Sequence, residues 1–87
     1  MTSSCNGNWV CYLLRCTDGT LYCGITNDMG RRLSAHNAGI AAKYTRTRGP
    51  VSLVFTENCM DRSSASKRES EIKKLTRTQK LALIDSA

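Results

Sequence analysis

Two tyrosines, one arginine and one histidine lie close together in this 87-residue sequence: Tyr12, Tyr22, Arg32 and His36. Arginine offers a permanent positive charge to a phosphate, and histidine exchanges protons near neutral pH. Tyrosine is an awkward base, because its ordinary pKa near 10 leaves only about one part in a thousand ionised at pH 7. Cleavage of a phosphodiester bond needs an activated nucleophile, neutralised charge and a stabilised leaving oxygen. A divalent metal on one carboxylate, an arginine and a proton acceptor can supply all three.

The two tyrosines fall on apolar runs that flank residues 17–19, so the pair predicts a hairpin. A two-residue turn would place Tyr12 and Tyr22 on opposite faces of the sheet. A three-residue turn with Gly19 in the left-handed conformation pairs Tyr12 with Gly24 and turns both rings to one face. Gly24 would then leave room beside the Tyr12 ring. The residues alone permit both registers.

An amphipathic helix is predicted over residues 28–38, capped by Asn27 or Asp28. Its apolar stripe includes His36, and Arg32 borders that stripe because residues three and four apart share a helix face. Taken without the tyrosines, Arg32 would be an exposed surface charge and His36 a buried, hydrogen-bonded helix residue.

The rest of the chain predicts one strand and two helices. Residues 51–56 form a third apolar run, which would complete a three-stranded antiparallel sheet. Residues 61–75 predict a helix, and residues 76–79 have the form of a capping box that opens a last helix through Ile84. The predicted fold is therefore α/β, with helices flanking the sheet, in the order β-β-α-β-α-α.

Composition fits one small globular domain, with 40% hydrophobic and 23% charged residues. Residues 1–8 are small and polar and predict a disordered tail, which leaves residues 9–87 as the domain. No apolar run has the length of a signal peptide or membrane span, so a cytoplasmic or nuclear location, without membrane attachment or secretion, is expected. The odd count of five cysteines and the lack of a secretion signal argue against disulfides. The lack of a Cys-x-x-Cys pair and the single histidine argue against zinc. Cys11, Cys16 and Cys23 are expected to be small apolar strand residues.

The formal charge of +6, from 13 Lys+Arg against 7 Asp+Glu, predicts a polyanionic partner. Nucleic acid is favoured over anionic membrane, because no strongly amphipathic basic helix is present. Basic side chains that merely solvate the surface are the alternative. The connection at residues 40–50 carries basic residues around one aromatic: Lys43, Tyr44, Arg46 and Arg48. Such a loop can follow a phosphate backbone and stack on a base, although a merely solvated loop is the alternative.

One carboxylate lies where an apolar side chain would be expected. At about 100° per residue, Glu69 falls inside the stripe that includes Ile72 and packs toward the sheet, whereas Glu71 lies at its far edge. A carboxylate in a buried stripe costs several kcal/mol unless it is paired, hydrogen-bonded or metal-bound. A salt bridge from Glu69 to Lys73 or Arg32 and a metal site both satisfy that requirement.

The sequence resembles the GIY-YIG nuclease superfamily from about Trp9 to Ile84. Val10-Cys11-Tyr12 and Tyr22-Cys23-Gly24 stand in the places of the two name-giving triplets, and Arg32, His36 and a later Glu follow at the expected spacing. Further segments narrow the resemblance to the small stand-alone UPF0213 (YhbQ-like) group: Ala42-Lys43-Tyr44-Thr45-Arg46, Gly49-Pro50 and Ile72-Lys73-Lys74-Leu75. The triplets depart from the family pattern, because both middle residues are Cys and the first triplet lacks its Gly.

The resemblance implies that both tyrosines line one active site, which favours the three-residue turn. It implies that Arg32 binds the scissile phosphate and that Glu69 holds Mg²⁺ (or Mn²⁺). Tyr12 would be the general base toward water, and Tyr22 would orient the water or the phosphate. His36 or Lys43 could share the proton transfer, and the sequence does not rank them.

The resulting hypothesis is a metal-dependent DNA endonuclease of weak sequence specificity, selective for structure, such as branched or single-stranded DNA, in repair or processing, with no small-molecule cofactor. Five residues would contact the nucleic acid: Lys43, Tyr44, Arg46, Arg48 and Lys73. The alternatives are a catalytically weak or inactive nucleic-acid-binding module and a protein-interaction domain. Two departures from the wider family bear on this choice. The last asparagine is Asn58, although many members carry a later one, and no DNA-reading domain is attached.

Overall fold

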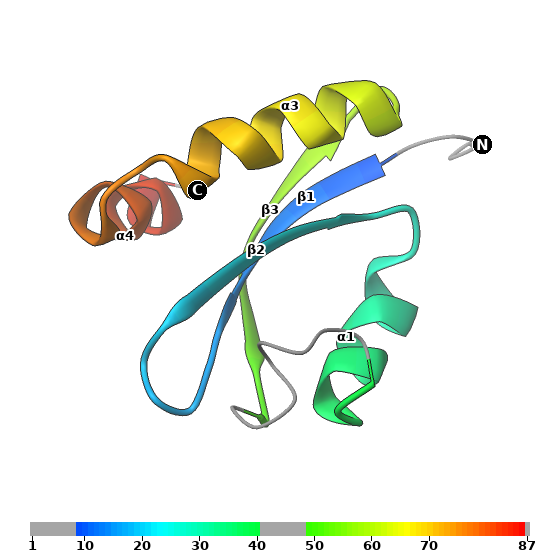
Figure 1. The fold of residues 1–87 in the computed structure, drawn as a ribbon, viewed down its shortest axis with the longest axis vertical. Coiled ribbons are helices and arrows are strands. Elements are labelled where there is room, and N and C mark those ends of the chain that lie inside the picture. Colours follow the sequence, from blue (N-terminus) through cyan, green and yellow to red (C-terminus); the bar gives the residue numbers. More distant parts are fainter. Residues whose placement is uncertain (1–8, 41–48, 87) are drawn as a thin grey trace.

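The computed structural model describes residues 9–40 and 49–86 and has the predicted order β-β-α-β-α-α within an α/β fold (Figure 1). The elements are β1 (Trp9–Arg15), β2 (Leu21–Thr26), α1 (Met29–Asn37), β3 (Ser52–Cys59), α3 (Arg62–Lys73) and α4 (Arg77–Ser86). The three strands form one antiparallel sheet in the order β2-β1-β3, so β2 is an edge strand. The residues of the basic connection named above, Lys43, Tyr44, Arg46 and Arg48, and the tail at residues 1–8 lie outside the described residues.

The hairpin adopts the three-residue turn. Tyr12 pairs with Gly24 in the ladder between β1 and β2. The amide of Gly19 donates to the Cys16 carbonyl at 2.9 Å, and Gly19 has φ +84°, the left-handed conformation that glycine adopts without strain. The Asp18 carboxylate accepts hydrogen bonds from the amide and hydroxyl of Thr20, which fixes the turn further.

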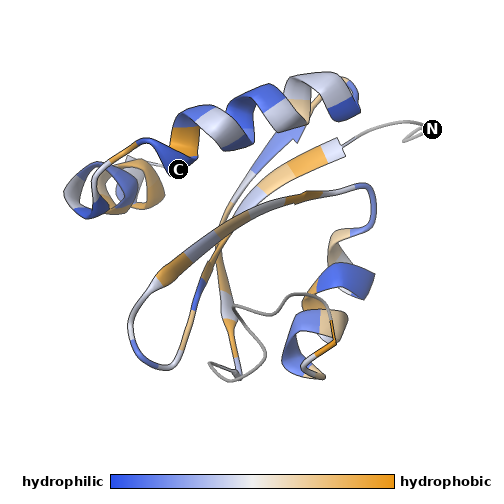
Figure 2. Ribbon diagram, viewed as in Figure 1, coloured by the Kyte–Doolittle hydropathy of each residue, from blue (hydrophilic) through white to orange (hydrophobic). Residues whose placement is uncertain are grey.

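The alternation of side chains along the strands divides the core into two layers. The first cluster lies under α3 and α4 and contains Cys11, Leu13, Cys23, Phe55 and Ile72. The second lies on the α1 side and contains Tyr12, Leu14, Cys16 and Val51, with Met29 and Leu33 of α1 packed against it. Figure 1 shows the two helical layers on either side of the sheet, and Figure 2 shows apolar residues concentrated on β1 and β2. Cys11, Cys16 and Cys23 are buried free thiols, as expected for small apolar residues. Only Cys11 and Cys23 lie on strands, because β1 ends at Arg15 and Cys16 follows it directly.

The predicted end of the third strand was wrong. The strand predicted at residues 51–56 extends to Cys59, because β1 begins at Trp9 and Trp9 pairs with Cys59. Polar side chains on this extension are accommodated at the surface, where Glu57 pairs with Arg68 at 3.0 Å. The helix predicted to reach about Leu75 ends at Lys73, and the amides of Lys74 and Leu75 just beyond it bond three residues back in a tighter turn.

The helix starts are satisfied as predicted. Asp28 caps α1, its side chain accepting from the amide of Arg31 at 3.1 Å. Thr76 and Gln79 form the predicted capping box before α4, each side chain bonded to the backbone amide of the other. No helix among the described residues has the length and apolarity needed to cross a membrane.

Gly19 supports the first stability prediction. Gly19→Ala should lower the free energy of unfolding by about 1 kcal/mol, because alanine is strained at φ +84° although no atom lies within 4 Å of its added methyl group. Gly30→Ala in α1 is the matched control and should stabilise by a few tenths of a kcal/mol, up to about 1, because alanine is the better helix former. Urea unfolding measures both. Equal effects of the two substitutions would contradict the turn assignment.

Candidate functional site

The α1 face of the sheet brings together the four residues with which the sequence analysis began. The hydroxyl of Tyr12 lies 2.9 Å from Nε2 of His36. The Tyr22 and His36 rings meet edge to face, with centroids 5.2 Å apart. Tyr12 and His36 are each 1% exposed, whereas Tyr22 is half-buried and Arg32 is exposed. The Tyr12–His36 pair is therefore buried, and the cluster reaches the surface through Tyr22 and Arg32.

Local structure explains why these side chains meet. The three-residue turn pairs Tyr12 with Gly24 and Leu14 with Tyr22, which places both tyrosines on the α1 face. The Tyr12 ring lies against Gly24, since a Cβ added there would be 2.5 Å from the Tyr12 hydroxyl oxygen. Gly24 is thus required for space, as the sequence predicted for this register. The apolar stripe of α1 then places His36 against Tyr12.

Burial sets the protonation states of the cluster. It raises the pKa of Tyr12 to about 12; Tyr22 adds to the rise, and the positive charge of Arg32 opposes it. A lowered pKa would make Tyr12 a better base, but without a metal the effect of burial outweighs that of Arg32. Burial, together with Arg32, also lowers the pKa of His36. Near pH 7, Tyr12 is therefore protonated and His36 is neutral.

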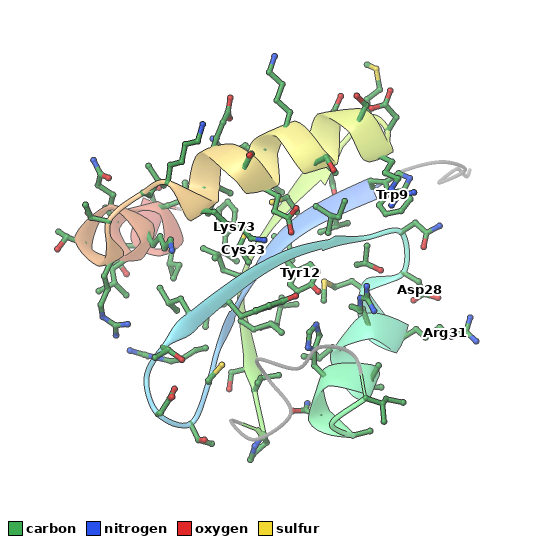
Figure 3. The ribbon with its side chains drawn as sticks, viewed as in Figure 1. Trp9, Tyr12, Cys23, Asp28, Arg31 and Lys73 are labelled. Atoms are coloured by element: carbon green, nitrogen blue, oxygen red, sulfur yellow. The ribbon has the colours of Figure 1, made fainter. Side chains whose placement is uncertain are left out.

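Glu69 lies on the other side of the sheet. It is on α3, its side chain is 23% exposed, and its Oε2 lies 3.4 Å from Nζ of Lys73. Its charge acts on Cys11 and Cys23, which belong to the cluster under α3. Figure 3 shows Lys73 and Cys23 on the α3 side of β2 and Tyr12 on the α1 side. The salt bridge to Lys73 is thus one of the two arrangements that the sequence allowed, and the four-residue cluster forms without Glu69.

The donor set for a metal is small. Among the described residues there is no group of three His, Cys, Asp or Glu side chains that could hold a metal ion. Glu69 offers one partly exposed carboxylate, whose ion pair with Lys73 is long. One carboxylate fits Mg²⁺, which keeps most of its water ligands when one or two carboxylates bind it. The fit is therefore to a weakly bound, largely hydrated ion.

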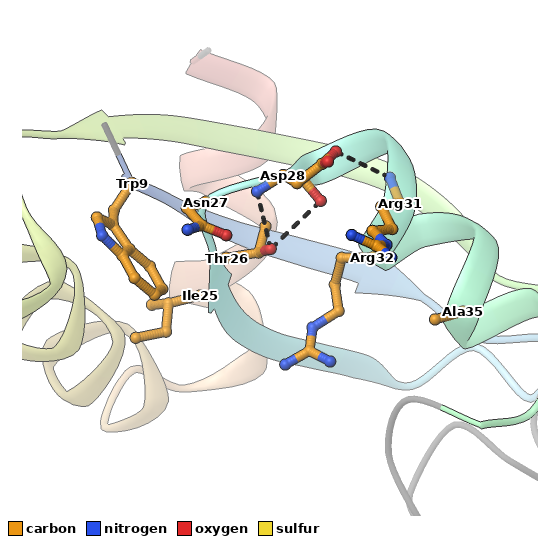
Figure 4. A pocket seen from close by; sticks show the side chains of 8 residues that line it. All are labelled: Trp9, Ile25, Thr26, Asn27, Asp28, Arg31, Arg32 and Ala35. Atoms are coloured by element: carbon orange, nitrogen blue, oxygen red, sulfur yellow. Dashed lines mark hydrogen bonds between the residues drawn. The ribbon is translucent and has the colours of Figure 1, made fainter. Parts of the chain in front are cut away.

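A groove of about 570 Å³ opens beside Arg32, where β2 leads into α1 (Figure 4). Residues from both sides of the sheet line it: Trp9 and Ile25 from the α3 side, and Asp28, Arg31, Arg32 and Ala35 from the α1 side. The contributions of Trp9 and Arg31 were not predicted from the sequence. Their signals were present, since Trp9 is the only tryptophan and Arg31 precedes Arg32. Only the fold shows that the start of β1 lies beside the start of α1.

The chain matches the GIY-YIG catalytic domain over residues 8–82. It is 50% identical over 80 residues to the UPF0213 protein DP2720 of Desulfotalea psychrophila, covering 91% of this chain and 73% of that protein. It is 55% identical over 75 residues to the UPF0213 protein CPE1444 of Clostridium perfringens, covering 86% of this chain and 81% of that protein.

A solved structure has the same architecture. The solution NMR structure of the UPF0213 protein BH0048 from Bacillus halodurans superposes with a TM-score of 0.58 at 42% sequence identity. The match covers 90% of this chain and 83% of that chain. At this identity and coverage, the likeness extends over nearly the whole domain.

His36 predicts a dependence of stability on pH. Because the pKa of His36 is lowered on folding, the unfolded chain takes up a proton first as the pH falls, and protons then favour unfolding. The free energy of unfolding should therefore fall as the pH drops below about 6.5, the ordinary histidine pKa. Urea unfolding between about pH 7.5 and 5.5 measures this, above the range where carboxylates titrate.

His36→Gln is the control for this prediction. It removes the only histidine, so the loss of stability over that pH range should disappear even if the variant is less stable throughout. A pH dependence that persists unchanged in His36→Gln would contradict the assignment of a neutral, buried His36.

Proposed function

Because the chain belongs to the GIY-YIG catalytic-domain family of nucleases, in its UPF0213 group, we propose that it is a metal-dependent DNA endonuclease with weak sequence specificity. One observation carries the proposal: the buried hydrogen bond between Tyr12 and His36, beside the exposed guanidinium of Arg32. This arrangement pairs a proton acceptor with a cation, as hydrolysis of a phosphodiester bond requires. DNA repair or processing, on branched or single-stranded substrates, is the proposed setting.

The hydrogen bond supports a two-step proton path. In the tautomer with its proton on Nδ1, neutral His36 accepts the Tyr12 proton at Nε2. The Tyr12 oxygen takes a proton from the attacking water, so the net transfer is from water to His36. Histidine, with an ordinary pKa near 6.5, is a better final acceptor at neutral pH than tyrosine alone. The hydrogen bond to Tyr12 thus supports His36 as the partner in proton transfer, and Lys43, the other candidate from the sequence, lies outside the described residues.

Arg32 and Tyr22 are the members of the cluster that can meet the substrate. Arg32 is exposed and would bind the scissile phosphate, where its charge would stabilise the transition state. Tyr22 is half-buried against His36 and would orient the water or the phosphate. Lys73, exposed on α3, would add a phosphate contact, together with the basic connection that lies outside the described residues.

Glu69 would hold Mg²⁺ or Mn²⁺, and the bound ion would supply charge neutralisation at the phosphate. Without metal, the Lys73 ammonium balances the carboxylate charge. The edge position of β2 supports a substrate that reaches both faces, because the groove beside Arg32 is itself lined from both sides of the sheet.

A binding module without turnover is the second candidate. The separation of Glu69 from the tyrosine cluster, and its pairing with Lys73, favour this candidate. The two candidates differ in a simple assay: purified protein with branched, single-stranded and duplex DNA, with Mg²⁺, with Mn²⁺ and with EDTA. Salt-sensitive binding without metal-dependent cleavage would support the binding module.

Tyr12→Phe tests the proton path. The variant keeps the ring against Gly24 but removes the hydroxyl, so Mg²⁺-dependent cleavage should fall by about 10²-fold or more. The loss of one hydrogen bond should lower the free energy of unfolding by only about 1 kcal/mol. DNA binding in EDTA should be unchanged and serves as the control for folding. Cleavage at the wild-type rate would remove Tyr12 from the mechanism.

Glu69→Gln tests the metal site, and Glu71→Gln is its matched control on the same helix. Glu69→Gln should abolish Mg²⁺-dependent cleavage while DNA binding and fold persist. Glu71 pairs with Arg68 at 3.2 Å at the surface, so Glu71→Gln should change little. Should Glu69→Gln cleave near the wild-type rate, the metal assignment fails.

A further inference from the structure

One wall of the groove beside Arg32 is aromatic, and the proposed hydrolysis does not use it. Trp9 lies at the start of β1, half-buried, and its indole faces the groove next to Ile25 (Figure 4). The guanidinium of Arg62 lies 5.8 Å from the indole ring centroid and helps to hold the ring. A half-buried aromatic ring on the wall of an open groove is a surface on which another flat ring can stack.

The opposite wall is cationic. Arg32 extends into the groove, and exposed Arg31 stands at its rim. Among the described residues that line the groove, Asp28 has the one carboxylate, and it caps α1 by accepting from the amide of Arg31. A groove with an aromatic wall and two guanidinium groups suits a molecule that has both a flat ring and a negative charge. Nucleotides have this combination, with a base and a phosphate joined by a sugar.

Size and position agree with this chemistry. A volume of about 570 Å³ is in the range of sites that hold small organic ligands and is open enough for a chain to pass through. Arg32 lines this groove and also belongs to the Tyr12–His36 cluster. A strand whose phosphate lies on Arg32 would therefore place its neighbouring nucleotide in the groove.

We propose that this groove binds one unpaired nucleotide adjacent to the scissile phosphate, with its base stacked on Trp9 and its phosphate on Arg31. This rests on the proposed function, in which Arg32 holds the scissile phosphate. A base in a duplex is already stacked and paired, and leaving the stack costs a few kcal/mol. The groove therefore selects single-stranded or splayed DNA over continuous duplex.

Trp9 reports on its own occupancy, because it is the only tryptophan in the chain. The experiment titrates the full chain in EDTA with short oligo(dT), with the corresponding duplex and with polyphosphate, following tryptophan emission and fluorescence anisotropy. Oligo(dT) should quench the emission and bind about ten-fold more tightly than duplex. Polyphosphate should bind without quenching, because it has charge but no base.

Two substitutions at Trp9 separate the effect of an aromatic ring from that of a large apolar side chain. Trp9→Leu should weaken oligo(dT) binding about ten-fold, the loss expected for one stacked base, whereas Trp9→Phe should restore most of the affinity. Arg31→Gln should lower the slope of binding against salt by about one unit. Lys74→Gln, at the exposed far end of α3, is the charge-matched control and should leave the quenching unchanged.

Wild-type emission that stays constant at saturating oligo(dT) would overturn the proposal, as would quenching by polyphosphate or full affinity in Trp9→Leu. The titration is done in EDTA and does not depend on cleavage. Absence of cleavage with Mg²⁺ would therefore overturn the endonuclease proposal but not a measured binding of oligo(dT) at Trp9. Conversely, Tyr12-dependent cleavage with full affinity in Trp9→Leu would retain the endonuclease and remove the nucleotide site.

Discussion

The left-handed turn residue of the β1–β2 hairpin sets the facing of every side chain on β2. With Gly19 at φ +84°, the ladder pairs Tyr12 with Gly24, and both tyrosines face α1. A shift of one residue would turn Tyr22 and Gly24 to the α3 side and send Cys23 to the other. The contact between Tyr12 and His36, the space over Gly24 and the groove at the end of β2 all depend on this one register. A backbone preference thus determines the chemistry available on the surface.

Much of this organisation could be predicted from the sequence. The order of the elements follows from local patterns, such as the N-cap at Asp28 and the capping box of Thr76 and Gln79, which act over a few residues. The end of β3 could not be found this way. Residues 57–59 are not a continuous apolar run, and they are strand because Trp9–Cys11 provide pairing partners far away in the chain. Tertiary pairing overrode local propensity there.

The candidate site divides in the same way. Residues three and four apart on α1 could be assigned to one face, so the meeting of Arg32 and His36 with the tyrosines followed once the register was known. The depth of burial could not be read from spacing, and burial decides that Tyr12 is protonated and His36 neutral. The spacing of apolar residues on α3 correctly predicted that Glu69 faces the sheet. It could not say which face of the sheet α3 would cover, and the Lys73 ion pair forms on the face away from the tyrosines.

The pleat of β1 and β2 also separates the letters of the two family triplets. Val10, Tyr12, Tyr22 and Gly24 face α1, whereas the middle letters, Cys11 and Cys23, face α3, with their sulfur atoms 3.9 Å apart in the core. The middle residues of the triplets are therefore constrained by the packing volume of the core. The outer tyrosines and glycine are constrained by the geometry around His36. A sequence pattern that gives all six triplet positions equal weight combines a packing constraint with a constraint on the site. Cysteine at both middle positions changes how a core layer is filled, not the chemistry on the other face of the sheet.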